Sequence, residues 1–168
     1  TPSRERIEHY RTTRREVEEA IGRINGRFGE VGRPIVHYVH RSIPKDQLGT
    51  YYSAADIMLV TPFKDGMNLV AKEYIAAQDP ADPGVLVLSR FAGAAAQLGS
   101  SLLVNPHDAE GMAEALQAAL EMPLAERRAR WRSAWNAIAD ASPEGWGERF
   151  LRSLSPEDFA LMPVAGEA

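Results

Sequence analysis

The chain has 168 residues, of which 45% are hydrophobic and 25% charged, values typical of a globular domain able to bury a core. Its formal net charge of −4 argues against nucleic acid as a partner, and the absence of cysteine excludes disulfides and thiolate metal sites. No apolar run approaches the roughly 18 residues that span a membrane, and nothing resembles a signal peptide, so we expect a cytoplasmic protein.

The chain starts without methionine and enters a helical pattern at once, with Ser3 as the expected cap. Such a start is typical of the middle of a domain, so we expect a processed or truncated chain. The helix is expected to end near NGRFGEVG, residues 25–32. The β-branched and aromatic residues of PIVHYVH, residues 34–40, predict a strand.

Strands and helices then alternate with short connections, and four strand–helix repeats predict a parallel, doubly wound sheet. Short apolar runs such as IMLV and VLVLS are typical of strands covered on both faces. The expected strands after the first are residues 57–60, 85–89 and 101–106; the expected helices are 44–56, 69–78, 90–99, 108–122, 123–140 and 142–154, the last capped by Ser142.

The turn after the strand at 57–60 lies where such sheets bind ligands. Asp65 and Gly66 are predicted to form it, with Gly66 supplying a backbone conformation that other residues resist. The first amides of the next helix lack intrahelical acceptors and favour an anion such as pyrophosphate. Glu73 lies two helical turns further on and is predicted to face the same cleft. Alternatively, Asp65 is only a helix cap, worth about 1 kcal/mol, and Lys72 and Glu73 are solvated.

The segment DGMNLVAKEY, residues 65–74, resembles the donor-binding segment of the trehalose-6-phosphate synthase family. GRINGRFG, ADIMLVTP, PGVLVLSRFAGAA and LLVNPHD resemble the same family in the same order, so the resemblance covers residues 1–154. It implies an α/β fold: a three-layer, Rossmann-like parallel sheet that forms the C-terminal domain of a GT-B glycosyltransferase. Residues 1–154 would be a nucleotide-sugar-binding domain without its first strands, and residues 155–168 a tail.

The resemblance also implies roles for individual residues. The nucleotide-sugar donor would be held by one continuous segment, residues 65–73. Asp65, as the catalytic residue, would bind the glucose hydroxyls together with Gly66, Met67 and Asn68. Leu69 and Val70 would bind the diphosphate, with Ala71 and Lys72 beside them, and Glu73 would bind the ribose. The backbone at Ile43 would contact the nucleobase. Arg4 would contact the phosphate of the acceptor, glucose 6-phosphate.

The implied reaction is the transfer of glucose from UDP-glucose or GDP-glucose to glucose 6-phosphate with retention, without a metal or other cofactor. The resemblance implies a missing N-terminal GT-B domain as partner, so this chain alone is expected to be inactive; a homo-oligomer is also expected. Two alternatives stay open, a pseudo-glycosyltransferase that couples cyclitols and a non-catalytic sugar-sensing domain. The intact DGMNLVAKEY argues against the first, and Arg4, Asp65 and Glu73 argue against the second.

The remaining candidates favour structural interpretations. The four histidines, His9, His37, His40 and His107, show no metal-ligand spacing with carboxylates. Trp131 and Trp135 are four residues apart and are predicted to pack on one helix face. AERRARWR, residues 125–132, is expected to be a solvated basic face.

Overall fold

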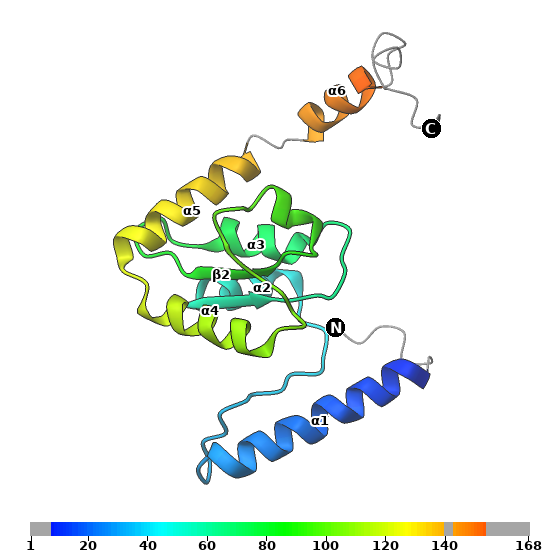
Figure 1. The fold of residues 1–168 in the computed structure, drawn as a ribbon, viewed down its shortest axis with the longest axis vertical. Helices are drawn as coiled ribbons and strands as arrows, with labels where there is room; N and C mark the ends of the chain where they lie inside the picture. Colours follow the sequence, from blue (N-terminus) through cyan, green and yellow to red (C-terminus); the bar gives the residue numbers. More distant parts are fainter. Residues whose placement is uncertain (1–7, 140–142, 154–168) are drawn as a thin grey trace, which may run out of the picture. The chain divides into compact units, whose positions relative to one another are not determined.

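The computed structural model describes residues 8–139 and 143–153, and the chain divides into two units, residues 1–48 and 49–168. In the first unit, helix α1 (Glu8–Phe28; Figure 1) is followed by a turn at Gly32, which has φ of 76°. Helix α2 (Lys45–Ser53) starts in the first unit and ends in the second. Ser3, Arg4 and the 155–168 tail lie outside the described residues, as does Ser142.

The strand predicted for residues 34–40 is wrong, because these residues join no strand ladder. The side chain of Asn25 forms hydrogen bonds with both backbone polar groups of Val36. Its Nδ2 donates to the Val36 oxygen at 2.9 Å, and its Oδ1 accepts from the Val36 nitrogen at 2.8 Å. These bonds satisfy both backbone polar groups of Val36, which lies in irregular backbone despite the β-branched residues of this segment.

The second unit is built on a parallel sheet in the order β1 (Ile57–Val60), β2 (Val85–Ser89), β3 (Leu102–Val104). All five residues of β2 are buried, which confirms the expectation of a fully covered apolar strand. The flanking strands are more open, with Leu59 of β1 and Leu103 of β3 exposed. Among the described residues, three of the four expected strands are therefore formed.

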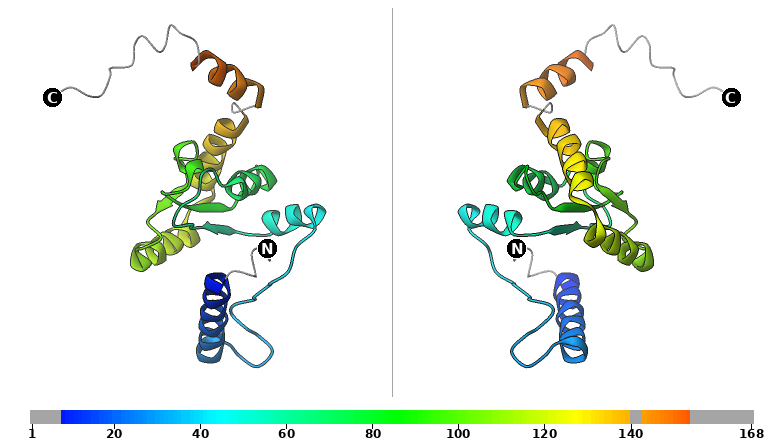
Figure 2. Two further views of the ribbon diagram at one scale, coloured as in Figure 1. Left: turned by 90° about the vertical axis from the view of Figure 1, so that its right-hand side faces the viewer. Right: turned by 90° about the vertical axis from the view of Figure 1, so that its left-hand side faces the viewer.

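Helices cover both faces of this sheet and give the expected three layers (Figure 2). On one face, α3 (Leu69–Ala77) and α5 (Leu124–Ala139) pack around the buried side chains of Tyr74, Leu88 and Leu98. On the other, α4 (Ala109–Glu121) packs its Ala119 against Val85, Val87 and Val104. The remaining elements are the 3₁₀ helix η1 (Gly93–Ala96) and α6 (Pro143–Ser153).

Tyr74 attaches α3 to the starts of two strands. Its side chain is fully buried, and its hydroxyl donates to the Ala55 carbonyl at 3.0 Å, just before β1. The same hydroxyl lies against Gly84, just before β2, where a Cβ would overlap it and approach the Ala55 oxygen within 2.7 Å. Glycine is therefore required at position 84, because only a residue without a side chain admits the tyrosine.

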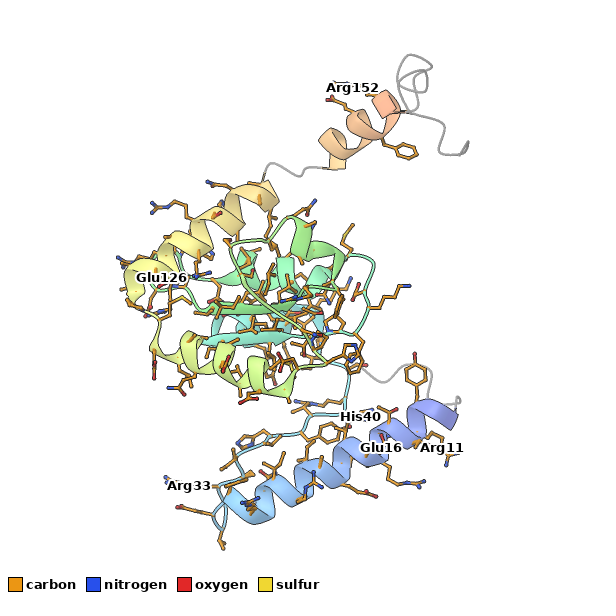
Figure 3. All side chains as sticks on the ribbon, in the orientation of Figure 1. Arg11, Glu16, Arg33, His40, Glu126 and Arg152 are labelled. Carbon is orange, nitrogen blue, oxygen red and sulfur yellow. The ribbon has the colours of Figure 1, made fainter. Side chains whose placement is uncertain are left out.

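Residues 125–132 are exposed or half-buried, as expected of a solvated face, but arginines among them also bond to neighbouring loops. Arg127 donates to the Pro83 carbonyl at 2.6 Å and pairs with Asp82 at 2.7 Å. Arg130 donates to the Ser100 carbonyl at 2.9 Å and pairs with Glu126, which Figure 3 labels on α5. These bonds hold α5 against the loops that precede β2 and β3.

The tryptophan prediction is confirmed. Trp131 and Trp135 stack with their rings 5.8 Å apart, and Trp131 Nε1 donates to the Ile75 carbonyl of α3 at 2.9 Å. Within the described residues, no helix is both long and apolar enough to cross a membrane.

Replacing Tyr74 with phenylalanine should remove about 1–2 kcal/mol of stability, because the partly buried Ala55 carbonyl loses its donor. Burial raises the pKa of Tyr74 above its ordinary value of 10.0, with a smaller contribution from Asp56. As the pH rises, Tyr74 therefore ionises in the unfolded chain before it ionises in the folded chain. Its contribution to the free energy of unfolding is complete below pH 10 and decreases above pH 10.

The measurement is denaturant unfolding of wild type and Tyr74→Phe from pH 8 to 11, with Tyr51→Phe at an exposed position as control. The two curves should differ by a constant amount up to pH 10 and then converge. A stability difference no larger than that of the control would contradict this role of Tyr74.

Candidate functional site

The carboxyl ends of the three parallel strands meet at one edge of the sheet, where ligands bind in open α/β folds. The loop after β1 contains residues 65–68, called here the Asp65 turn, and leads directly into α3. The loop after β2 contains residues 91–94 and leads into η1. The structure therefore places the predicted donor turn beside a second loop at this edge.

Asp65 is half-buried, and its carboxylate accepts hydrogen bonds from two later residues of the same turn. Oδ1 accepts from the Met67 amide at 3.0 Å, and Oδ2 accepts from Asn68 Nδ2 at 3.1 Å. A carboxylate offers about four lone-pair positions, so each oxygen can still accept a further hydrogen bond from a ligand hydroxyl. The two internal bonds hold the carboxylate in one orientation.

Asn68, rather than Asp65, is the cap of α3. Its Oδ1 accepts from the Ala71 amide at 3.0 Å, and its backbone is left-handed, with φ of 74° and ψ of 86°. The prediction that Gly66 supplies the unusual backbone conformation is wrong. Among the described residues, only Asn68 and Gly32 have positive φ, so Gly66 does not. Asparagine tolerates this region because its short amide bonds locally, here to both the helix and Asp65.

Backbone hydrogen bonds join the Asp65 turn to residues 91–94. The Asp65 amide donates to the Phe91 oxygen at 3.3 Å, the Gly93 amide to the Asp65 oxygen at 3.0 Å, and the Ala94 amide to the Met67 oxygen at 2.7 Å. A Cβ at Gly93 would overlap the Gly66 carbonyl oxygen. Gly93 received no role in the sequence analysis, although a glycine shortly after a buried strand is a signal of close backbone approach.

Helix α3 turns one face to the core and another to solvent. Ala71, Tyr74 and Ile75 are buried. Leu69, Val70 and Glu73 are exposed, and Glu73 follows Leu69 by four residues and Val70 by three, which places it on the same helix face as these two. Among the described residues no acceptor is recorded for the Leu69 and Val70 amides, as expected for the first turn of a helix.

The other predicted members of this segment differ in their surroundings. The Ala71 amide is occupied by Asn68, Lys72 is half-buried, and Met67 is exposed. Glu73 accepts a hydrogen bond at 3.0 Å from the hydroxyl of Tyr52, a residue of α2 that the sequence analysis placed in a helix but gave no role. The structure thus brings together residues 65–73 on one turn and one helix face.

An aromatic cluster that the sequence analysis missed lies at the same edge of the sheet. Phe63 stacks on His107 with ring centres 4.6 Å apart, and Phe91 meets His107 edge-on at 6.1 Å. These rings follow β1, β2 and β3, and all three residues are exposed. His107 is thus a surface residue.

The structure does not test the two remaining predicted residues. Ile43 is half-buried and belongs to the first unit, before α2. Arg4 lies outside the described residues. Within residues 8–139 and 143–153, no group of three or more histidines and carboxylates is arranged to hold a metal ion.

The α/β fold, with its candidate site at the carboxyl edge of a parallel sheet, is that of a glycosyltransferase domain, and the family model for glycosyltransferase family 20 matches residues 1–156. The chain belongs to this family.

Its relatives include the trehalose-6-phosphate synthase of Mycobacterium leprae, 50% identical over 155 residues, which cover 92% of this chain and 31% of the relative. The chain thus spans about a third of the length of the curated relatives it matches.

Solved structures give the same result. The UDP-forming alpha,alpha-trehalose-phosphate synthase of Burkholderia xenovorans, in complex with glucose-6-phosphate, is 48% identical with a TM-score of 0.87, covering 91% of this chain and 34% of that one. An E. coli structure bound with UDP-2-fluoro glucose is 46% identical with a TM-score of 0.86, covering 90% and 34%. The predicted fold class, the C-terminal domain of a GT-B fold, is confirmed.

Replacing Gly93 with alanine should displace the Asp65 turn, because the new methyl group would occupy the place of the Gly66 carbonyl. We expect a loss of about 1–3 kcal/mol and altered backbone amide shifts at residues 65–68 in ¹H–¹⁵N spectra. Gly99→Ala is the control, since a Cβ there meets no atom within 4 Å. If Gly93→Ala left the shifts and the stability as in Gly99→Ala, the close contact would be disproved.

Proposed function

We propose that the chain is the donor-binding part of a trehalose-6-phosphate synthase. The enzyme would transfer glucose from a nucleotide diphosphate glucose to glucose 6-phosphate with retention. The chain matches family 20 over residues 1–156. The observation that supports the proposal is its hydrogen-bonded turn and helix face at residues 65–73, which lie at the edge of the sheet where ligands bind in such folds. The named activity and ligands of the relatives support the choice of reaction.

The donor would lie along the Asp65 turn and α3. Asp65 would accept hydrogen bonds from glucose hydroxyls through the lone pairs left by Met67 and Asn68. The open amides of Leu69 and Val70, at the positive end of α3, would meet the diphosphate. Glu73, one helical turn further, would accept from the ribose hydroxyls.

In the reaction, the bond between the anomeric carbon and the diphosphate oxygen breaks, and the acceptor hydroxyl forms a bond on the same face of the sugar. The acceptor proton passes to the leaving diphosphate. The contribution of this chain is electrostatic, because amides held in place before the reaction stabilise the charge that develops on the leaving group. Arg4 would bind the acceptor phosphate, and the backbone at Ile43 the nucleobase.

The whole activity requires a further part of the enzyme, the N-terminal GT-B domain, which would supply most acceptor contacts. A homo-oligomeric state and a cytoplasmic location also remain predictions. Calorimetric titration of the chain with UDP-glucose and with GDP-glucose would establish which nucleotide it binds, and the absence of binding to both would contradict the proposal.

Activity can be tested in a chimera in which this chain replaces the matching 155 residues of the Mycobacterium leprae relative. The chimera should form trehalose 6-phosphate, and Asp65→Ala should reduce its turnover at least about 100-fold, because Asp65 would no longer bind or orient the transferred sugar.

Asp108→Ala is the matched control. Asp108 is the cap of α4, where its Oδ1 accepts from the Gly111 amide at 3.0 Å, so its loss costs about 1 kcal/mol, as for any cap. Similar thermal midpoints for the two variants, with turnover lost only in Asp65→Ala, would support the proposal. Equal turnover in the two variants would restrict Asp65 to a structural role.

A further inference from the structure

Tyr52 and Glu73 are 21 residues apart in sequence and belong to different helices, yet their side chains meet. The Tyr52 hydroxyl donates to Glu73 Oε2 at 3.0 Å. Tyr52 lies near the end of α2, and Glu73 is on the solvent-facing side of α3. Both residues belong to the second unit, so the contact lies within one compact part of the chain.

The backbone of Tyr52 is held independently of this contact. Its carbonyl accepts from Gln78 Nε2 at 2.6 Å, and the Oε1 atom of the same buried glutamine accepts from the Gly84 amide at 2.7 Å. The Tyr52 ring is partly buried against the core cluster that contains Tyr74 and Leu88. The phenol oxygen thus has a position set by the fold, while the rest of the Glu73 side chain faces solvent.

The hydroxyl stays a hydrogen-bond donor at all ordinary pH values. Burial, the bond to Glu73 and the charge of Glu73 all raise the pKa of Tyr52 above its usual value. An exposed glutamate normally samples several rotamers, and ordering such a side chain on binding a ligand costs free energy. A donor that already holds one carboxylate oxygen reduces this cost and leaves Oε1 open.

We propose that Tyr52 is a positioning residue for ribose recognition: its hydroxyl orients the Glu73 carboxylate so that the carboxylate accepts from the vicinal 2′- and 3′-hydroxyls of a nucleoside diphosphate. This rests on the proposed function, in which Glu73 binds the ribose. Tyr52 does not touch the ligand. Its effect is confined to ligands that carry the diol.

The test compares UDP with 2′,3′-dideoxyuridine diphosphate, which lacks the diol but keeps the base and both phosphates. Each is titrated into the ¹⁵N-labelled chain and followed by amide shifts, which measure dissociation constants up to the millimolar range. The variants are Tyr52→Phe, which removes only the hydroxyl and keeps the ring in the core, and Tyr51→Phe, which removes an exposed hydroxyl from the adjacent residue. Glu73→Gln shows the effect of removing the carboxylate itself.

In wild type and Tyr51→Phe, UDP should bind more tightly than the dideoxy analogue. In Tyr52→Phe, the affinity for UDP should fall about 3- to 10-fold, as for the loss of one hydrogen bond, while that for the analogue stays unchanged. A purely structural role would weaken both ligands equally or neither.

The remaining outcomes separate this inference from the proposed function. If wild type prefers UDP and Tyr52→Phe retains the full preference, the role of Tyr52 is overturned and that of Glu73 stands. If wild type binds the two ligands equally or binds neither, the ribose-binding role of Glu73 fails, and the role of Tyr52 fails with it.

Discussion

The left-handed backbone of Asn68 is the constraint on which the candidate site depends. With φ of 74°, this residue reverses the chain between β1 and α3 so that its side chain reaches forward to the Ala71 amide and back to the Asp65 carboxylate. The same geometry leaves the first amides of α3 at the ligand edge of the sheet. A β-branched residue at this position would be strained, and aspartate would bring a second negative charge beside Asp65.

A second loop holds this turn against the sheet. The hydrogen bonds between residues 65–67 and 91–94 are backbone to backbone, and Gly93 allows the approach. Below them, Tyr74 and Trp131 attach α3 to β1 and α5 through buried or partly buried hydrogen bonds. A rigid core beneath a turn with its own internal bonds holds potential ligand-binding groups in place before a ligand arrives, which reduces the free-energy cost of ordering them on binding.

The sequence predicted the sheet, the order of the helices and the segment 65–73, because buried apolar runs, helix breaks and family motifs are local signals. It failed at residues 34–40, which form no strand, it offered Asp65 and not Asn68 as the alternative helix cap, and it assigned the special backbone to Gly66. The errors at the turn have a common cause: its hydrogen bonds are made by the Asn68 side chain, whose direction a residue pattern does not specify. Gly93 and Tyr52 were missed because their roles arise from contacts 21 or more residues away in sequence.

The account is tested most directly by mapping UDP-glucose onto the ¹⁵N-labelled chain through its amide shifts. It predicts saturable changes centred on residues 66–70 and at Glu73, and their loss in Asp65→Ala while Asp108→Ala retains them. Saturable changes centred elsewhere, or the same changes at residues 66–70 and at Glu73 in Asp65→Ala, would contradict the assignment of this turn and helix face as the donor site.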